Sequence, residues 1–414
     1  MDRKITIVFF DAGGGHRNAA EALKAVLESH SRPWQVELLN LQELLDRLDV
    51  LKKLTGLRIQ DGYNFILRKG WTRLTPQLLP LLQSVVRVYH RPTVKMLGEY
   101  WKANPTDLVL SVVPHFNRAI VESIRKAMPS AHFVTLITDL ADYPPHFWIE
   151  KESEYLICGS EKAQQQAFAY GHNRDHVFLA SGMVMRPKFY AKTSLNRTEE
   201  RNKLGLDRNT PTGMVLFGGH GSSAILNIVN RLNTGNASLQ LILICGKNQK
   251  LLSAVKKLRT RFPMFAEGFT QSVDYYMALS DFFIGKPGPG SISEALQFDL
   301  PVMVECNGRT LPQERYNAQW IQEKKVGVVL NSFRNINQGL EKLLDPEAFA
   351  EYRANARAYK NNALYEIPEF LDEIVGRRFP AGTGSPVASL ERTPALQRAA
   401  WASITSRIQL DWGT

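Results

Sequence analysis

Cysteine is scarce in this sequence, and long apolar runs are absent. Three cysteines occur, far apart and each in or near an apolar run: Cys158, Cys245 and Cys306. Their spacing argues against a disulfide framework and indicates buried thiols in a reducing compartment. No apolar run approaches the roughly 18 residues of a membrane-spanning helix, and the first residues lead into a strand-like run without a secretory segment. We therefore expect a cytoplasmic protein whose membrane contact is peripheral.

The sequence does contain enough apolar material for two domains. A chain of 414 residues exceeds one ordinary core, and its 44% hydrophobic and 22% charged residues are usual for a globular protein. Short apolar runs alternate with helical stretches, which predicts an α/β fold with doubly wound parallel sheets covered on both faces. We expect strands at 5–10, 36–41, 107–113, 132–137, 154–158 and 177–180, and again at 213–217, 239–244, 281–284, 301–305 and 326–330.

The composition also predicts where the domains begin and end. The first domain is expected at 1–190 and the second at 213–375, with a polar linker at 191–212 between them. From 376 to 414, Gly, Pro, Ser and Thr dominate, which predicts a loosely ordered tail.

Positive charge is concentrated in a predicted helical insertion at about 42–105. The net charge is +11, and +8 of it lies between Leu51 and Lys102, where aromatic and aliphatic residues interleave with the basic ones. This mixture suits an anionic membrane surface, but helix packing or a solvated basic face would also explain it. Nucleic-acid binding is not expected, because no zinc-finger, RRM or KH signature accompanies the charge. The candidate membrane residues are Lys52, Lys53, Arg68, Lys69 and Trp71.

Glycine-rich segments follow three of the strand-like runs and precede helices. They are Gly13–His16, Gly218–Ser222 and Gly285–Ser291. Glycine lets the backbone approach a ligand closely, and a helix N-terminus offers N–H groups to an anion. The second and third segments therefore predict a nucleotide site at the carboxyl ends of parallel strands, where Glu294 suits the vicinal hydroxyls of a ribose. The alternative is an ordinary glycine-rich turn before an N-capped helix.

Several of these segments together resemble one enzyme family. Gly13–His16 with the following Ala19 and Ala20, the run Gly288–Ala295, and the pair Gln313–Glu314 are similar to motifs of the monogalactosyldiacylglycerol synthase and processive diacylglycerol glucosyltransferase family. The resemblance covers about residues 4 to 345. It implies an inverting glycosyltransferase related to MurG, with two Rossmann-like domains facing a cleft (the GT-B fold).

The resemblance also implies the substrates. The donor would be UDP-galactose or UDP-glucose, and the acceptor 1,2-diacylglycerol at an anionic membrane, which makes a monoglycosyldiacylglycerol. GT-B enzymes stabilise the leaving diphosphate with helix dipoles and hydrogen-bond donors, so no cofactor and no metal is expected. The expected donor-site residues are Gly218, Gly219, His220, Gly221, Ser222, Phe269, Thr270, Gly288, Gly290, Ser291, Glu294, Gln313 and Glu314, and the expected acceptor loop is Gly13, Gly14 and Gly15.

Within that donor site the roles differ. The diphosphate would lie on Gly218–Ser222, where His220 either donates to phosphate or caps the helix. The uracil would meet the Phe269–Thr270 segment. Gln313 and Glu314 supply donors and acceptors for sugar hydroxyls, or are surface polar residues at a helix start.

Two residues of the first domain are candidates for the base that takes the proton of the acceptor alcohol. An imidazole suits a base near neutral pH, and His16 lies in the glycine segment; its alternative role is to order that loop. Asp139, at a predicted strand end, either orients His16 or is itself the base. His115 follows Pro114, the reverse of the order usual in the family.

Other classes remain open at this stage. A UDP-N-acetylglucosamine 2-epimerase shares the two-domain fold and needs no lipid acceptor. A MurG-like transferase acts on a polyprenyl-linked acceptor. A silent sugar-nucleotide or lipid-binding protein would keep the site without turnover.

Overall fold

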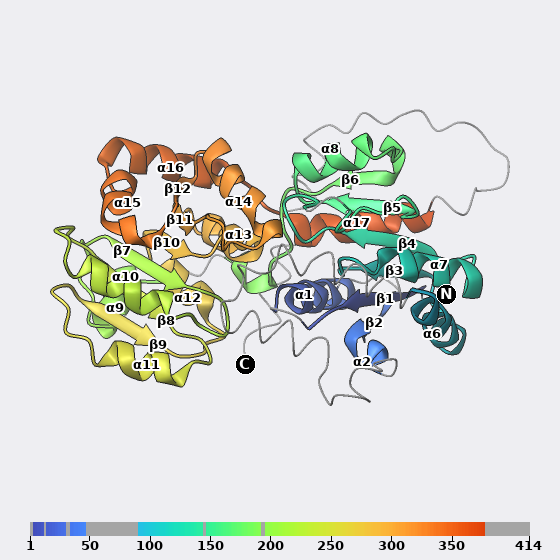
Figure 1. Ribbon diagram of the computed structural model, residues 1–414, viewed down its shortest axis with the longest axis horizontal. Coiled ribbons are helices and arrows are strands. Elements are labelled where there is room, and N and C mark those ends of the chain that lie inside the picture. The colour runs from blue at the N-terminus through green and yellow to red at the C-terminus, as the bar shows by residue number, and fades with distance from the viewer. Residues whose placement is uncertain are drawn as a thin grey trace. The chain divides into compact units, whose positions relative to one another are not determined.

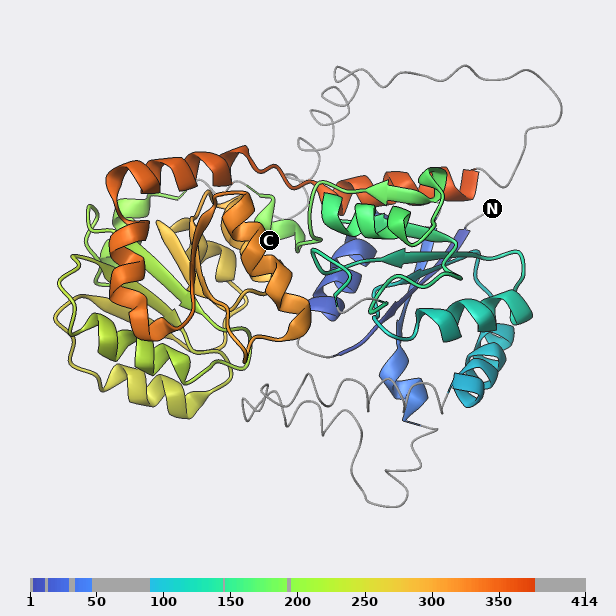
Figure 2. The same ribbon diagram turned by 45° about the horizontal axis from the view of Figure 1, so that its top comes forward.

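A computed structural model describes residues 3–11, 14–29, 34–46, 90–143, 146–191 and 195–376. These residues form two six-stranded sheets whose strands all run parallel, with helices on their faces (Figure 1, Figure 2). The two sheets confirm the predicted α/β, GT-B-like class.

The first sheet has the strand order β2-β1-β3-β4-β5-β6. Its strands are β1 (Arg3–Phe9), β2 (Trp34–Asn40), β3 (Leu108–Ser111), β4 (His132–Leu136), β5 (Tyr155–Cys158) and β6 (Val177–Leu179). Its helices are α1 (Gly15–Ser29), α2 (Leu41–Leu45), α6 (His90–Ala103), α7 (Asn117–Ala127) and α8 (Glu161–Ala169), with 3₁₀ turns η2 (Arg174–His176) and η3 (Pro187–Phe189). The direction of chain progression reverses between β1 and β3, which is where open α/β sheets bind ligands.

The second sheet has the order β12-β11-β10-β7-β8-β9, and here the reversal lies between β7 and β10. Its strands are β7 (Thr212–Leu216), β8 (Gln240–Ile244), β9 (Met264–Glu267), β10 (Phe282–Gly285), β11 (Val302–Glu305) and β12 (Gly327–Leu330). Its helices are α9 (Arg197–Lys203), α10 (Ala224–Leu232), α11 (Gln249–Lys256), α12 (Val273–Ala278), α13 (Pro289–Gln297), α14 (Pro312–Glu323), α15 (Ile336–Leu343) and α16 (Pro346–Ala358), with the 3₁₀ turn η4 (Phe333–Asn335). The sequence analysis had not included β9.

Apolar runs explain why these strands are central. Every residue of β8 and of β3 is buried, as expected for a parallel sheet covered on both faces. Helices contribute one apolar face each: α6, for example, buries Leu97 and Trp101 against Val109 of β3. The sheets are therefore rigid platforms, and the loops at their carboxyl ends are positioned by buried strands.

The last described helix, α17 (Ala363–Gly376), belongs by its contacts to the first sheet. The indole N–H of Trp34 donates to Asp372 at 3.1 Å, and the backbone N–H of Ser181 donates to Glu366 at 2.7 Å. Phe370 packs on Phe178 with ring centroids 5.1 Å apart. The sequence-based bounds assigned this helix to the second domain, 213–375. In the structure the chain has already returned to the first sheet at α17 (Figure 2).

Several sequence-based expectations fall on other parts of the chain. Residues 47–89, which contain most of the predicted basic insertion, and the tail 377–414 lie outside the described residues. Of the predicted linker at 191–212, the structure places 197–203 in helix α9 and Thr212 in β7.

Candidate active site

The glycine loop after β7 needs glycine for geometric reasons. Gly218 and Gly221 have φ of +77° and +70°, a region that side chains disfavour. A Cβ at Gly221 would collide with the carbonyl oxygen of Cys245, and one at Gly246 would lie 2.5 Å from the carbonyl oxygen of Gly219. The β7 and β8 loops therefore pack backbone to backbone beside the N-terminus of α10.

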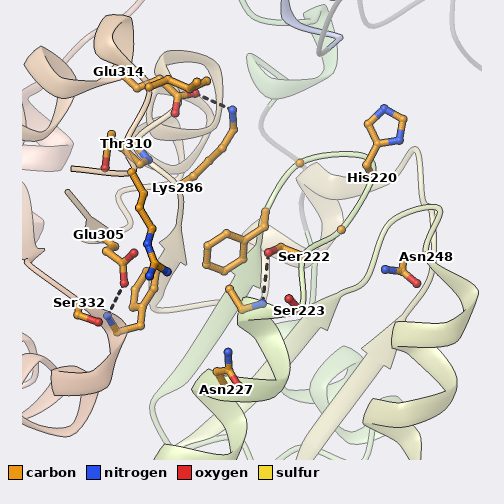
Figure 3. Close-up of a pocket in the computed structure, with 18 of the residues that line it drawn as sticks. His220, Ser222, Ser223, Asn227, Asn248, Lys286, Glu305, Thr310, Glu314 and Ser332 are labelled. Atoms are coloured by element: carbon orange, nitrogen blue, oxygen red, sulfur yellow. Dashed lines mark hydrogen bonds and ion pairs between the residues drawn. The ribbon is translucent and has the colours of Figure 1, made fainter. Parts of the chain in front are cut away.

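A pocket of about 1670 Å³ opens over this loop at the carboxyl ends of the second sheet (Figure 3). The loops after β7, β8, β10, β11 and β12 all contribute to its wall. Six of the predicted donor residues line it: Gly218, Gly219, His220, Gly221, Ser222 and Glu314. The pocket spans the switch point of this sheet, which is the reversal of chain progression between β7 and β10. It therefore lies at the carboxyl ends of parallel strands, where the sequence predicted a nucleotide site.

Glu314 forms the polar wall of the pocket together with a lysine. It starts α14, is 7% exposed, and accepts from Lys286 Nζ at 2.6 Å. The amide of Asn317 donates to the Pro287 carbonyl at 2.8 Å, so α14 and the β10 loop are held together. Glu314 thus presents a fixed carboxylate rather than a mobile surface group, whereas its neighbour Gln313 is half-buried outside the pocket lining.

The other predicted donor residues do not line this pocket. Phe269 is 53% exposed, with Lys247 Nζ 5.2 Å from its ring centroid, and it is followed by Thr270. Gly288 caps α13, where Ser291 Oγ donates to the Gly288 carbonyl at 3.2 Å and Gly290 lies in the first turn.

Glu294 is set apart from the pocket in the second turn of α13. Burial raises the pKa of its carboxyl to about 7, against the opposing effect of Arg186 and Lys188. A carboxyl that is half-buried among cations fits a ligand contact, but the structure places it outside the pocket wall.

The pocket also contains side chains that the sequence analysis missed. They lie at or after the ends of β10, β11 and β12: Lys286, Glu305, Asn307, Arg309, Thr310 and Arg334. Their position directly after predicted strands was the available signal, because the ends of parallel strands meet at one edge of a sheet.

In the first sheet, the β1 loop places His16 at the start of α1. Gly14 has φ of +84° and Gly15 begins the helix, while Gly13 lies outside the described residues. His16 Nδ1 is 3.2 Å from Thr138 Oγ1, on the loop after β4. Burial lowers the pKa of His16 to about 4, so this imidazole is a weak base.

Asp139 is the neighbour of Thr138 but does not pair with His16. Its Oδ2 accepts from the indole Nε1 of Trp148 at 2.9 Å, and its side chain is 7% exposed. Burial raises the pKa of Asp139 to about 7, although the hydrogen bond from Trp148 opposes this. His16 and Asp139 therefore both lie near Trp148 at the carboxyl edge of the sheet, since the imidazole and indole centroids are 5.7 Å apart.

Trp148 is itself held firmly. It is fully buried, its backbone N–H donates to Asp142 at 2.7 Å, and its carbonyl accepts from the Asn117 amide at 3.0 Å. Asn117 in turn accepts from Ser111 Oγ at 2.6 Å, at the end of β3. The hydrogen-bond donor to Asp139 is thus held in place by residues at the end of β3 and on the loop after β4.

His115 adopts a left-handed conformation, with φ of +67°. Its ring packs on Phe147 at 4.2 Å, its Nε2 is buried without a partner, and burial lowers its pKa to about 4.

Among the described residues, no three His, Cys, Asp or Glu side chains are grouped as metal ligands would be. No helix within the described ranges is long and apolar enough to cross a membrane.

Comparison with known proteins agrees with this architecture. Residues 214–371 match the glycosyltransferase family 28 C-terminal domain. The chloroplastic monogalactosyldiacylglycerol synthase of Spinacia oleracea is 26% identical over 91% of this chain and 73% of its own.

Solved structures share the fold at lower identity. MurG of Acinetobacter baumannii superposes with a TM-score of 0.58 at 13% identity, over 90% of this chain and 99% of its own. A UDP-N-acetylglucosamine 2-epimerase gives 0.57 at 13% identity, over 94% and 100%. The fold alone is common to both activities, whereas the sequence similarity extends through both sheets to the synthases. The chain is thus a glycosyltransferase of the GT-B fold that carries the family 28 C-terminal domain and is homologous to the monogalactosyldiacylglycerol synthases.

Proposed function

We propose that this glycosyltransferase moves a hexosyl group from a UDP-sugar to 1,2-diacylglycerol, with inversion at the anomeric carbon. The observation that carries the proposal is the similarity to a monogalactosyldiacylglycerol synthase over 91% of the chain. The glycine-walled pocket at the β7/β10 switch point supplies a donor site of the required kind.

The donor would bind along the second sheet. The diphosphate lies over Gly218–Ser222, where a glycine-rich backbone and the N-terminus of α10 favour an anion. The hydroxyls of the sugar meet Glu314 near the start of α14, whereas Gln313, outside the pocket wall, is a candidate by its resemblance to the family. The uridine extends toward Phe269 and Glu294, which lie outside the pocket wall and remain candidate ligands by their resemblance to the family.

At the first sheet, Asp139 is the better base of the two candidates. A base should have a pKa near the working pH, and Asp139 at about 7 meets that condition where His16 at about 4 does not. Trp148 occupies Oδ2 of Asp139, while no hydrogen bond engages Oδ1 among the described residues. His16, held by Thr138, would orient the acceptor rather than take its proton.

The hexosyl transfer forms one bond and breaks one bond at the anomeric carbon. The acceptor hydroxyl loses its proton to Asp139 as its oxygen forms a bond to the anomeric carbon. The bond from that carbon to the diphosphate oxygen breaks, and the electron pair leaves with UDP. Attack opposite the leaving group inverts the configuration. Donors at the glycine loop, with Lys247 and Lys250 beside it, stabilise the charge that develops on UDP.

The diacylglycerol acceptor resides in a membrane, and the predicted basic segment 51–102 would bring the enzyme there. Of this segment, residues 51–89 lie outside the described residues, including Lys52, Lys53, Arg68, Lys69 and Trp71. Their charge favours anionic lipids.

The experiment is an assay of the purified chain with UDP-glucose, UDP-galactose, UDP-glucuronate or UDP-galacturonate and vesicles containing diacylglycerol. We expect a glycolipid and stoichiometric UDP, identified by mass spectrometry. Release of a 2-epimerised sugar without lipid product would assign the epimerase activity instead. UDP binding without any turnover would indicate a sugar-nucleotide-binding protein without catalytic activity. A product formed only with a polyprenyl-linked acceptor would show that this lipid, and not diacylglycerol, is the acceptor.

A further inference from the structure

The pocket of the second sheet has more positive charge than a UDP-sugar with an uncharged hexose requires. Its wall contains six basic and two acidic side chains, a net charge of +4, whereas the diphosphate of a UDP-hexose has roughly two negative charges. The basic residues are Arg231, Lys247, Lys250, Lys286, Arg309 and Arg334, and the acidic ones are Glu305 and Glu314.

The lysines account for the diphosphate end. Lys247 and Lys250 follow β8, and the backbone N–H of Lys247 donates to the carbonyl of Gly219 at 2.9 Å, so these residues stand beside the glycine loop. Lys286 is matched by Glu314 at 2.6 Å. Two lysines therefore face two phosphate charges, and the Lys286–Glu314 pair lies where the sugar hydroxyls are placed.

Three arginines remain, on the loops after β11 and β12 and on α10. Arg231 Nη1 donates to the carbonyl of Arg334 at 3.4 Å, which puts both at one end of the pocket. The guanidinium groups of Arg309 and Arg334 make no hydrogen bond or ion pair with any described residue. In Figure 3 this end, marked by Glu305 and Ser332, lies across the pocket from His220 and Asn248.

The one carboxylate at this end is already engaged. Glu305 Oε2 accepts from the backbone N–H of Phe333 at 2.6 Å, and Oε1 accepts from the Asn307 amide at 3.0 Å. Its bonds therefore tie the β11 loop to the β12 loop instead of pairing with an arginine. Three guanidinium groups and one carboxylate leave this end of the pocket with a net positive charge that an anion would neutralise.

The backbone that presents these arginines is fixed. Asn307 Oδ1 accepts from the N–H of Arg309 at 2.8 Å, and its Nδ2 also donates to the Asn331 carbonyl at 2.9 Å. The Arg334 N–H donates to Ser332 Oγ at 3.2 Å. Loops that are ordered before binding lose less entropy when a ligand arrives.

We propose that the donor sugar is acidic: a UDP-hexuronate, whose C6 carboxylate is bound by Arg309 and Arg334. This inference rests on the proposed function and narrows its sugar class. The planar guanidinium matches a carboxylate with two parallel hydrogen bonds, which a hydroxymethyl group cannot form. The transfer step is unchanged, because the carboxylate takes no part in the bonds that form and break.

The test measures binding of UDP, UDP-glucose, UDP-galactose, UDP-glucuronate and UDP-galacturonate by calorimetry. One variant combines Arg309→Gln and Arg334→Gln. The matched control is Arg208→Gln, an exposed arginine before β7 and outside the pocket wall. Thermal melting checks that each variant is folded.

We expect at least one acidic donor to bind the unaltered chain roughly ten- to hundred-fold more tightly than its neutral counterpart, the effect of a charge-assisted hydrogen bond. The double variant should abolish this preference and keep its affinity for UDP, while Arg208→Gln keeps the preference. Equal affinities for acidic and neutral donors, or an equal loss for UDP in the double variant, would overturn the inference. If UDP and all UDP-sugars failed to bind, the proposed function itself would fall.

Discussion

At the scale of single residues, burial acts in opposite directions on the two candidate bases. It raises the pKa of Asp139 to about 7 and lowers that of His16 to about 4, because in each case it disfavours the charged form. Asp139→Asn should therefore lower kcat by roughly 10²- to 10⁴-fold, the usual loss of a general base. In the unaltered enzyme, kcat should fall as the pH drops below about 7, where Asp139 becomes protonated. Steady-state rates between pH 5 and 9 test both.

The histidine supplies the contrast for that experiment. His16→Asn keeps a hydrogen-bonding group near Thr138 and should retain much of the activity if the imidazole only orients the acceptor. A full loss in His16→Asn beside a mild loss in Asp139→Asn would make the histidine the base and contradict our assignment.

Trp148 should influence the acidic limb of the kcat profile, which is the pH range where kcat falls as Asp139 becomes protonated. Its hydrogen bond favours ionised Asp139, so Trp148→Phe should raise the pKa of that carboxyl and move the limb of the kcat profile to higher pH. Trp101→Phe is the matched control, since it loses a buried indole bond of 2.9 Å to Ser123 away from the site. If both variants shift the limb equally, or neither does, Trp148 does not act through Asp139.

The sequence pattern selected His16 and Asp139 as candidates, but it did not indicate that each contacts another residue instead: His16 contacts Thr138, and Asp139 accepts from Trp148. A glycine segment before a helix and an acid at a strand end are local features that the chain displays openly. The indole near both side chains belongs to Trp148, on the irregular stretch after β4, and the backbone bonds of Trp148 to Asp142 and Asn117 have no periodic signature. The position of a hydrogen-bond donor inside a core follows from the packing of the side chains around it, which the sequence alone does not show.

At the scale of elements, the apolar runs predicted eleven strands of the two sheets to within two residues at each end. The missed strand, β9, is the edge of the second sheet, and all four of its residues are only half-buried. Edge strands need fewer apolar residues because one side lacks a partner, so Met264–Glu267 does not stand out from its surroundings.

Helix α9, in the predicted linker, is tied to the second sheet by a buried ion pair. Arg201 is 4% exposed and donates to Asp281 at 2.7 Å, whereas Arg197 donates to the same carboxylate at 2.9 Å but is 40% exposed. Arg201→Met should destabilise the fold by about 3–5 kcal/mol, because it leaves a partly buried carboxylate with a weaker partner. Arg197→Met should cost about 1 kcal/mol or less. Urea unfolding of both variants measures the difference; equal losses would show that burial does not decide the strength of this pair.

At the scale of the whole molecule, both sheets use the same rule to build a site. Each reverses its chain progression beside its first strand, and each places a glycine segment and a polar loop at that reversal. The repetition was visible in the sequence as two series of strands. The return of α17 to the first sheet was not, because the bond from Trp34 to Asp372 joins residues more than three hundred positions apart.

The whole molecule must also reach its lipid acceptor, and the basic segment is the candidate for that contact. Reversing Lys52, Lys53, Arg68 and Lys69 to glutamate should weaken binding to anionic vesicles on the order of a thousand-fold or more, since each basic residue near such a surface contributes about 1 kcal/mol. Vesicle sedimentation with and without phosphatidylglycerol measures this.

A charge-matched variant decides whether the effect is local. Reversing four exposed basic residues of the second sheet domain, Arg208, Lys257, Arg259 and Lys324, changes the net charge equally. If the membrane contact belongs to the basic segment, this second variant should still sediment with anionic vesicles, and both variants should bind UDP as the unaltered chain does. Equal release of the two variants would mean that net charge alone draws the enzyme to the membrane. Unchanged sedimentation of the first variant would assign its basic residues to packing or to a solvated face.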